Sequence, residues 1–542
     1  IHTAQKPKPF IFQIVKNRNT DILRHKKSGT QNAISKIQHV FNNNKTETEM
    51  SDILSSEAKD FLSQPLQLFI NGSWQASKNG GSTDVINPSN GQSVASVASG
   101  DEADVNVAVE VADLAFQEWS KRTPESRAAL LNKLANALED KMDVLAQLEA
   151  LDVGKAFANA KGFDIPFGID CVRYYADLAT QAEYEKPLHL NDIDARVHRV
   201  PYGVCGFIFP WNFPFDLLMW NVMPALAAGN TVVIKPAELT PLTTLYFCKV
   251  AEEVGIPAGV INVVVGAGRK VGTPLVQHPK IRRISFTGSS GVGKQIAAMC
   301  GERPIPCKLE LGGKGAAVVF EDADMDKAVT QLAGAITLNT GQVCCTATRW
   351  LIHESIYDQF VEKVTATLKA TKIGPGLDPD TQMGPLVSQA QQDTVLQYLD
   401  KGLSEGAEAI LDGGALSISG SEGGFYVSPY LLGGSADNVC FREEIFGPAA
   451  YLVKFKTETE ALELVNSLDY GLANSVFIED LTRCQRVAKQ MIAGNSWINA
   501  HNVFAYGLPY GGINKSGVGG GVNCPETFYD YLRDLTIARP LV

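Results

Sequence analysis

The chain has 542 residues, enough for three or four domains. Hydrophobic residues make up 45% of it and charged residues 20%, which is the balance of an ordinary folded globular protein and excludes a disordered or collagen-like chain. The formal net charge of −11 argues against nucleic acid as a partner, and no apolar run reaches the roughly 18 residues of a membrane-spanning helix.

Residues 1–49 differ from the rest in charge. They hold nine Lys and Arg against three Asp and Glu, are rich in Asn and Lys, and show no sustained periodicity. We expect residues 1–65 to form a basic, disordered N-terminal extension. A targeting peptide and a functional arm are the alternatives, and Met50 is a candidate start site.

The ten cysteines are sparse and include no CxxC pair. This pattern argues against a disulfide scaffold and a structural zinc site, and no His cluster suggests a catalytic metal. We therefore expect no metal, reduced thiols and a cytoplasmic location, with organelle targeting by residues 1–49 as the alternative.

Ordered structure is expected to begin near Leu66. LQLFINGSW predicts a strand, an Asn-Gly turn and a returning strand, and TDVINPSNGQSVASVAS repeats that pattern. A long helical stretch, RAALLNKLANALEDKMDVLAQLEALDVGK, ends near Gly154. From Val200 short apolar runs alternate with helical segments, first GVCGFIF, TVVIK, GVINVVV, RRISF and AAVVF, then TRWLIHE, AEAILDGG, FYVSPYLL, AAYLVKF, NSVFIED and GNSWINA. Such alternation predicts an α/β fold with parallel sheets covered by helices.

Two glycine-rich turns join a strand to a helix, one in VINVVVGAGRKVG and one, with Gly288 and Gly293, in RRISFTGSSGVGK. Glycine at such a turn lets a phosphate approach the backbone, although an ordinary tight turn explains each motif equally well. GSSGVGK matches most of a nucleoside-triphosphate loop, but Gln295 stands where magnesium needs Ser or Thr, so we exclude an NTPase.

Three polar residues stand out from their surroundings. Cys344 lies in the polar segment LNTGQVCCTATRW, whereas a structural cysteine normally has apolar neighbours. Glu310 precedes a Gly-Gly pair, and Asn212 lies between two aromatic residues in GFIFPWNFPF. Spacing alone does not decide their roles.

Seven segments in one order carry a family resemblance. They are PWNFP (210–214), TVVIKPAELTP (231–241), FTGSSGVG (286–293), LELGGK (309–314), GQVC (341–344), EEIFGP (443–448) and PYGGINKSGVG (509–519). Over residues 66–542 the sequence resembles the aldehyde dehydrogenase superfamily in its non-acylating, hydrolytic branch.

The resemblance implies a fold in three parts. A Rossmann-like dinucleotide-binding domain takes residues 66–182 and 202–312, and an α/β catalytic domain takes 313–515. A small β oligomerisation element, from 183–201 and 516–542, implies a homodimer or homotetramer. Its last segment, DLTIARPLV, predicts a strand that can extend a partner's sheet.

The resemblance also assigns the chemistry. Cys344 matches the nucleophile that forms a thiohemiacetal with the aldehyde, although reactivity alone leaves Cys345 as an alternative. Asn212 matches the oxyanion donor, and Glu310 matches the base that activates water to hydrolyse the thioester. Members that transfer the acyl group to coenzyme A commonly lack this glutamate, so a carboxylic acid is the expected product. A coenzyme A-acylating semialdehyde dehydrogenase and a non-enzymatic family member are the rival readings.

The implied cofactor is NAD, with NADP as the alternative. A carboxylate at the position of Glu238 accepts hydrogen bonds from ribose hydroxyls and repels a 2′-phosphate, whereas the lysine at Lys235 tolerates one. The remaining implied cofactor contacts are Gly288, Ser289 and Gly293 at the pyrophosphate turn, Glu444 and Phe446 at the nicotinamide, and, less specifically, Trp211.

The implied aldehyde tunnel is apolar. Phe167 stands where aminoaldehyde-type members tend to carry an acid, which favours an uncharged aliphatic or aromatic aldehyde. Betaine aldehyde and aminoaldehydes remain the alternative, because aromatic side chains also bind quaternary ammonium groups. The residues matching the tunnel, which could equally be ordinary core residues, are Phe213, Leu217, Trp220 and Phe504.

The chain departs from the family pattern at two places. Many members have Arg-Glu after the KSGxG stretch and Lys after the tunnel Trp, where this chain has Gly520-Gly521 and Asn221. That Lys and Glu are thought to help a proton leave the site, so their joint absence predicts another exit route or slower proton release.

Overall fold

The computed structural model describes residues 53–541, and the predictions for 1–49 lie outside this range. The first element is helix α2 (Ser56–Leu62), which lies within the segment 1–65 for which we expected no order. Ser55 caps this helix, and Glu57 accepts a hydrogen bond from Tyr246 and pairs with Lys141. These contacts tie α2 to the folded body upstream of the expected start at Leu66. No helix within 53–541 is long and apolar enough to cross a membrane.

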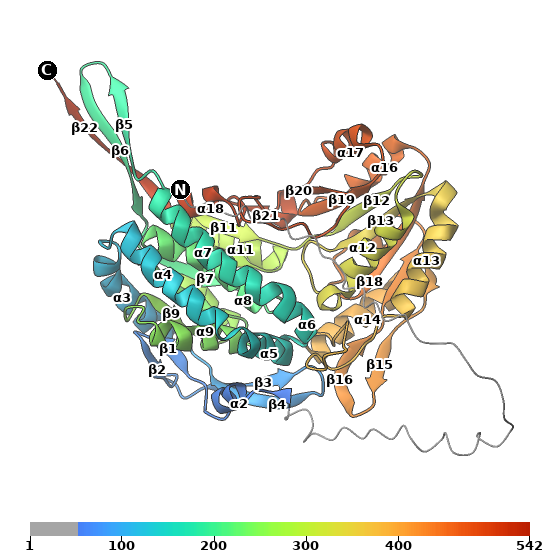
Figure 1. Cartoon of the computed structure of the whole chain (residues 1–542), viewed down its shortest axis with the longest axis horizontal. Helices are drawn as coiled ribbons and strands as arrows, with labels where there is room; N and C mark the ends of the chain where they lie inside the picture. The colour runs from blue at the N-terminus through green and yellow to red at the C-terminus, as the bar shows by residue number, and fades with distance from the viewer. Residues whose placement is uncertain (1–52, 542) are drawn as a thin grey trace, which may run out of the picture.

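An eight-stranded sheet organises residues 68–310 together with a late edge strand (Figure 1), in the order β2-β1-β9-β8-β7-β10-β11-β21. Its five central strands are parallel, and antiparallel strands close both edges. The strands are β1 (Leu68–Ile70), β2 (Ser73–Gln75), β7 (Val204–Ile208), β8 (Thr231–Lys235), β9 (Ile261–Val263), β10 (Ile281–Thr287), β11 (Cys307–Glu310) and β21 (Gly517–Val518). Because β8 and β10 flank β7 on opposite sides, the topological switch point lies beside β7, where α/β proteins bind ligands.

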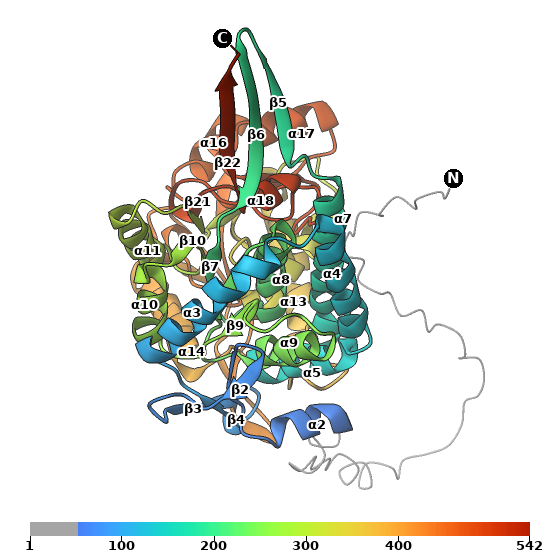
Figure 2. The ribbon, with the colours of Figure 1, turned by 90° about the vertical axis from the view of Figure 1, so that its left-hand side faces the viewer.

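Helices cover both faces of this sheet. Figure 2 shows α3, α10 and α11 on one side and α4, α5, α7 and α9 on the other, with α8 close to the strands. Their apolar residues recur at helical spacing, and α8 is buried along its whole length. The helices are α3 (Glu102–Trp119), α4 (Pro124–Glu139), α5 (Met142–Val153), α6 (Phe157–Asn159), α7 (Ile165–Gln181), α8 (Pro214–Ala228), α9 (Leu242–Glu253), α10 (Thr273–Gln277), α11 (Ser290–Glu302) and α18 (Pro525–Tyr529), with π-helical turns η1 (Ala160–Asp164) and η2 (Gly268–Gly272).

A second sheet of seven strands lies beside the first in Figure 1, in the order β14-β17-β18-β13-β12-β19-β20. All its strands are parallel except β14 at one edge. They are β12 (Gly315–Val319), β13 (Ala347–His353), β14 (Glu408–Leu411), β17 (Tyr430–Gly433), β18 (Ala449–Phe455), β19 (Ala473–Phe477) and β20 (Asn495–Ile498). The accompanying helices are α12 (Met325–Thr337), η3 (Leu338–Gly341), η4 (Glu354–Ile356), α13 (Tyr357–Lys369), α14 (Gln389–Ser404), α15 (Val439–Arg442), α16 (Glu458–Val465), α17 (Leu481–Ala488) and η5 (Asn514–Ser516).

Three smaller β units complete the fold. Strand β22 (Leu532–Pro540) pairs antiparallel with β6 (Ile193–Pro201), which pairs with β5 (Glu185–Leu190), and this sheet projects from the body (Figures 1 and 2). The hairpin β3 (Ser82–Asn87)–β4 (Gln92–Ala98) contacts the hairpin β15 (Ala415–Ile418)–β16 (Ser421–Val427), since Phe425 N–H donates to Pro88 O at 3.0 Å.

The strands read from the sequence are confirmed, with four local differences. FYVSPYLL forms two strands, β16 and β17, and the long helical stretch divides into α4 and α5 before ending at Gly154, whose φ is 85°. Strands β11 and β15 were not predicted. Within 516–542, expected to serve oligomerisation, β21 instead joins the first sheet and α18 packs on α8, so only β22 belongs to the projecting sheet.

Candidate active site

The predicted polar residues collect at one edge of the first sheet. Asn212 follows β7, Lys235 ends β8, Gly288 follows β10 and Glu310 ends β11. The carboxyl ends of parallel strands meet at the same edge, so four distant segments come together there. Thr287 and Glu310 are register partners, and Gly288 N–H donates to Glu310 O at 3.0 Å.

The segment carrying Cys344 follows α12 and is held by a tight turn. Asn339, Thr340 and Gly341 all have positive φ, of 47°, 56° and 73°. A Cβ at Gly341 would lie 2.1 Å from Gly447 O, so no side chain fits. On the other side, a Cβ at Gly313 would lie 2.2 Å from the Cys344 carbonyl oxygen. The turn is therefore clamped between two backbone segments, which fixes where the thiol lies.

The two adjacent thiols have different surroundings. Cys344 is partly exposed, and its Sγ lies 3.4 Å from the Tyr510 hydroxyl, whereas Cys345 is buried with its Sγ 3.4 Å from Asn502 Oδ1. Hydrogen bonds from the Cys345 thiol and the Tyr510 hydroxyl lower the pKa of Cys344 against the effect of burial. The same thiol contact, together with burial, raises the pKa of Cys345 well above its usual value. Cys344 is therefore the thiol that a dissolved aldehyde can reach more easily, and the thiolate is the nucleophilic form.

Glu310 is a buried carboxyl group with little to stabilise its charge. The residue is 7% exposed, and neither carboxylate oxygen has a hydrogen-bond partner among the described residues. Burial raises the pKa of Glu310 well above its usual value, the Lys308 charge partly opposes this, and a negative charge on Cys344 would raise it further. A carboxyl group whose pKa is raised by burial is a candidate for proton transfer.

Asn212 lies against the turn that carries the nucleophile. Its Nδ2 donates to Gln342 O at 3.0 Å, and Asn339 Nδ2 donates to Asn212 O at 2.8 Å. These bonds hold a side-chain amide two residues from Cys344. An N–H donor in this place can stabilise an oxygen that becomes negative when the thiolate attacks a carbonyl.

The residues implied to contact a cofactor lie on both sheets. Burial lowers the pKa of Lys235 to about 8 against the opposing charge of Glu238, and its Nζ donates to Pro236 O at 2.8 Å. Burial raises the pKa of Glu444 to about 7, and its Oε1 accepts from Gly313 N–H at 2.9 Å. Phe446, with φ 57°, packs edge-on against Trp211.

The glycine turn after β10 has two different functions. Ser289 caps α11 by accepting a hydrogen bond from Val292 N–H, which leaves the start of a 13-residue helix beside Gly288. Gly293 instead serves packing, because a Cβ there would lie 2.4 Å from Leu311 Cδ2.

Aromatic side chains surround Trp220 and extend to the nucleophile. The Trp220 ring centroid lies 5.9 Å from each of the rings of Phe167, Phe504 and Tyr510. The Tyr510 hydroxyl then contacts Cys344 Sγ. Two of the predicted tunnel residues, Trp220 and Phe504, thus share one cluster that leads to the thiol. The Phe213 ring lies under the Lys155 ammonium group at 4.1 Å, and Leu217 is buried in the same hydrophobic core as Trp220.

Residues 74–537 match the sequence model of the aldehyde dehydrogenase family. The chain belongs to the aldehyde dehydrogenase family. An aldehyde dehydrogenase of Emericella nidulans is 41% identical over 480 residues, which cover 87% of this chain and 95% of that protein. The mitochondrial aldehyde dehydrogenase of Homo sapiens is 38% identical over 458 residues, covering 84% and 88%. The resemblance read from the seven segments, and with it an oxidoreductase, is confirmed.

A solved structure extends the comparison to three dimensions. Betaine aldehyde dehydrogenase from Staphylococcus aureus, in complex with NAD+, superposes with a TM-score of 0.87 at 33% identity, covering 90% of this chain and 97% of that one. The predicted α/β class, with the aldehyde dehydrogenase fold, is therefore confirmed.

Two functional neighbours were missed in the sequence. Tyr510 lies within the PYGGINKSGVG stretch but was given no role, and its hydroxyl lies 3.4 Å from the Cys344 sulfur. His501 accepts from Ala347 N–H at 3.1 Å and contacts Ser475 Oγ at 2.7 Å, which fixes the start of β13 just after the vicinal cysteines. An aromatic hydroxyl in a Gly-rich motif was a signal for the first, whereas nothing local marks the second.

Asn221 has a structural explanation. Its Nδ2 donates to Leu217 O and its Oδ1 accepts from Ser285 Oγ, both at 2.9 Å, so a buried amide joins α8 to β10. No group of three or more His, Cys, Asp or Glu residues suited to a metal ion occurs between residues 53 and 541.

Proposed function

We propose that this aldehyde dehydrogenase oxidises an aldehyde to a carboxylic acid with NAD, through a cysteine thioester that water hydrolyses. The observation that carries the proposal is the convergence of a thiol of lowered pKa, a side-chain amide and a buried carboxyl group at one sheet edge. Members of a catalytic set with such different environments divide proton-accepting and nucleophilic roles between them.

The chain's own residues act in sequence. The Cys344 thiolate adds to the aldehyde carbon, while the Asn212 amide donates to the oxygen that becomes negative. When bound, NAD supplies the hydride acceptor that converts this adduct to a thioester. A water molecule then attacks the thioester. The water oxygen bonds to the thioester carbon while the Glu310 carboxylate takes a proton from that water. The carbon–sulfur bond breaks, the electron pair returns to Cys344 and the acid leaves.

The cofactor-side residues fit a dinucleotide. The N-terminal turn of α11, with Ser289 at its cap, presents backbone amides that favour a pyrophosphate. Glu238 disfavours a 2′-phosphate, which supports NAD over NADP, and Lys235 offers a hydrogen-bond donor at the end of β8. The NAD+ complex of the Staphylococcus aureus relative supports the same choice.

The aromatic cluster supports an uncharged aldehyde substrate. Phe167, Trp220, Phe504 and Tyr510 present ring surfaces on the approach to Cys344. The same rings favour betaine aldehyde as a second candidate, because a quaternary ammonium group binds aromatic faces. The betaine aldehyde dehydrogenase among its structural relatives supports this alternative. Glu310 argues against a coenzyme A-acylating enzyme.

The test is NADH formation with aliphatic, long-chain, aromatic and betaine aldehydes, without coenzyme A and with NADP in parallel. Cys344→Ala should abolish turnover, while Cys345→Ala, which keeps the nucleophile, should retain it. Turnover that survives Cys344→Ala and disappears in Cys345→Ala would reverse the assignment. Turnover that appears only with coenzyme A would replace hydrolysis by acyl transfer.

We also propose a homodimer or homotetramer assembled through the projecting sheet. Strand β22 is an edge strand with exposed Leu535 and Ile537, and β5 and β6 add exposed Leu190 and Ile193. Unpaired apolar edges of this kind are normally covered by another chain. A light-scattering mass of one chain would refute this proposal.

All ten cysteines are free, which supports a reducing compartment such as the cytoplasm. Fractionation of cells that produce the full chain tests the location, and recovery in an organelle would overturn it.

A further inference from the structure

Lys308 is a fully buried cation two residues before the proposed base on the same strand. Its exposure is 0%, and its Nζ donates to Gly521 O at 2.6 Å. The Nζ also lies 3.1 Å from Asp530 Oδ2, and the Asp530 side chain is 32% exposed. A buried lysine is costly unless paired, so its position calls for an explanation. The pair links the interior beside Glu310 to solvent.

Glycine backbone lies between the side chains of Glu310 and Lys308. Glu310 Oε1 lies 3.2 Å from the place of a Cβ on Gly511, and that place is 2.7 Å from the Gly521 Cα. The Gly521 carbonyl is the acceptor of the Lys308 hydrogen bond. A Cβ on Gly520 would lie 3.1 Å from Asp530 Oδ2. The Gly520-Gly521 pair, which replaces the expected Arg-Glu, therefore lies directly between Glu310 and the Lys308–Asp530 pair.

The proposed reaction leaves one proton on Glu310 in every cycle. Water gives this proton to the Glu310 carboxylate as the water oxygen bonds to the thioester carbon. Cys344 then leaves as a thiolate. Among the described residues no side chain bonds to the carboxylate oxygens of Glu310, and Asn221 cannot ionise, so the proton needs another path before the next turnover.

We propose that Lys308 and Asp530 form the route by which this proton leaves Glu310 for solvent. The Lys308 ammonium group gives a proton to Asp530, which releases it to bulk water. The resulting neutral amine then takes up the proton that Glu310 received from the hydrolytic water. This inference rests on the proposed hydrolysis and makes Lys308 a proton-relay residue.

The electrostatics around Lys308 support the transfer. Burial lowers the pKa of Lys308 and raises the pKa of Glu310, which brings the two groups toward equal proton affinity. Three other groups face Lys308. Asp530 raises the pKa of Lys308 and Arg283 lowers it, and the ring of Tyr531 lies 6.0 Å from the Lys308 Nζ. Arg283 also lies 3.7 Å from Asp530 Oδ2 and holds that carboxylate in place.

The decisive variants are Lys308→Met and Lys308→Arg. Arginine keeps the positive charge and the hydrogen-bond donors but does not give up its proton in proteins. A relay predicts that both variants reduce steady-state turnover by about tenfold or more, with an initial NADH burst of between one and two per site and an unchanged burst rate. Added imidazole should restore turnover, because it carries the proton instead. A merely structural cation predicts that Lys308→Arg behaves like the native enzyme, and that result would overturn the proposal.

If Lys308→Met does not fold, Asp530→Asn provides a second test, because this partly exposed position should tolerate substitution. It should reduce turnover in the same imidazole-dependent way. Lys372→Met, which removes a lysine paired with Asp380 at 2.8 Å on the surface, is the matched control and should change nothing. Equal slowing of the burst and of turnover in the Lys308 and Asp530 variants would refute the relay. A native enzyme that forms no NADH would instead refute the proposed function.

Discussion

Glu310 is a buried residue whose charge the fold stabilises little. Its raised pKa means that the carboxylate fraction, the only form that accepts a proton from water, grows as pH rises through that pKa. We expect Glu310→Gln to lower thioester hydrolysis by about 10²- to 10⁴-fold and to keep an NADH burst of one per site. Stopped-flow absorbance at several pH values checks this.

The native hydrolysis rate should rise with pH, and that rise should disappear in Glu310→Gln. Glu302→Gln, on the exposed end of α11, serves as the control. A variant that turned over at the native rate would exclude Glu310 as the base.

His501 shows how one buried side chain makes stability depend on pH. It accepts from Ala347 N–H, and burial lowers its pKa to about 3. An unfolded histidine binds a proton below about pH 6.5, so the unfolded state gains protons first as pH falls. The stabilising contribution of His501 is thus fully present above about pH 6.5, and it is lost as pH falls toward the pKa of about 3 in the folded state. His501 alone should contribute about 2 kcal/mol of destabilisation between pH 7 and pH 5.

The measurement is the difference in Tm between pH 7 and pH 5. It should be smaller in His501→Asn than in the native protein, although the variant is less stable overall because Ala347 N–H loses its acceptor. His189→Asn, on the exposed strand β5, should keep the native difference. An unchanged difference in His501→Asn would contradict the expected role.

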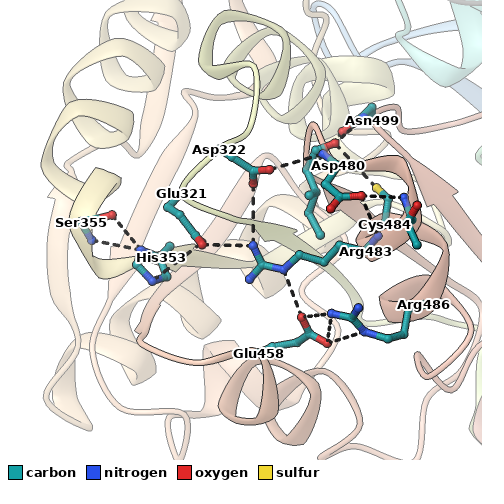
Figure 3. Close-up of polar contacts among 12 residues, drawn as sticks. Glu321, Asp322, His353, Ser355, Glu458, Asp480, Arg483, Cys484, Arg486 and Asn499 are labelled. Atoms are coloured by element: carbon teal, nitrogen blue, oxygen red, sulfur yellow. Dashed lines mark hydrogen bonds and ion pairs between the residues drawn. The ribbon is translucent and has the colours of Figure 1, made fainter.

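At the scale of elements, a charge network ties α17 and α16 to the end of β12 (Figure 3). Arg483 contacts Glu458 at 3.1 Å and Glu321 at 3.0 Å, and its guanidinium lies 4.3 Å over the Phe320 ring. Arg486, more than half exposed, pairs with Glu458 alone. Surface ion pairs contribute about 0–1 kcal/mol each, so the multiply bonded Arg483 should matter more.

We expect Arg483→Met to lower the stability of the second sheet's domain by about 1–2 kcal/mol, and Arg486→Met to lower it by less. Thermal unfolding of the two variants measures this, and aldehyde turnover at 25 °C should stay native in both. An equal loss in the two variants would show that the network adds nothing beyond its separate pairs.

Strand β11 shows where element prediction stops. The regular apolar strands β7, β8 and β12 are visible as short runs, but CKLE carries a lysine in a buried position. Lys308 is tolerated because Asp530 and Gly521, more than 200 residues later, supply its partners. No local pattern contains that information. Tyr510 differs, because its Gly-rich motif was a local signal, but its contact with Cys344 joins residues 166 positions apart and is visible only in the folded structure.

At the scale of the whole molecule, the motifs gave the family and the roles of Cys344, Asn212 and Glu310 as expectations, because each lies in a recognisable segment. The projecting sheet was also expected, but its exposed apolar side chains became visible only in three dimensions. Strand β22 keeps one edge unpaired, and Ile537 is 56% exposed on it. A monomer with such an edge would aggregate, so a partner chain is the physical expectation.

We therefore expect Ile537→Asp to break the assembly, because a charge at a buried interface position is costly. Light scattering should show a smaller species than the native protein, while the NADH burst per Cys344 stays measurable. Leu114→Asp, which alters an apolar residue 71% exposed on α3, should leave the mass unchanged. A native mass in Ile537→Asp would place the interface away from β22, and a lower mass in Leu114→Asp would move it to the α3 face.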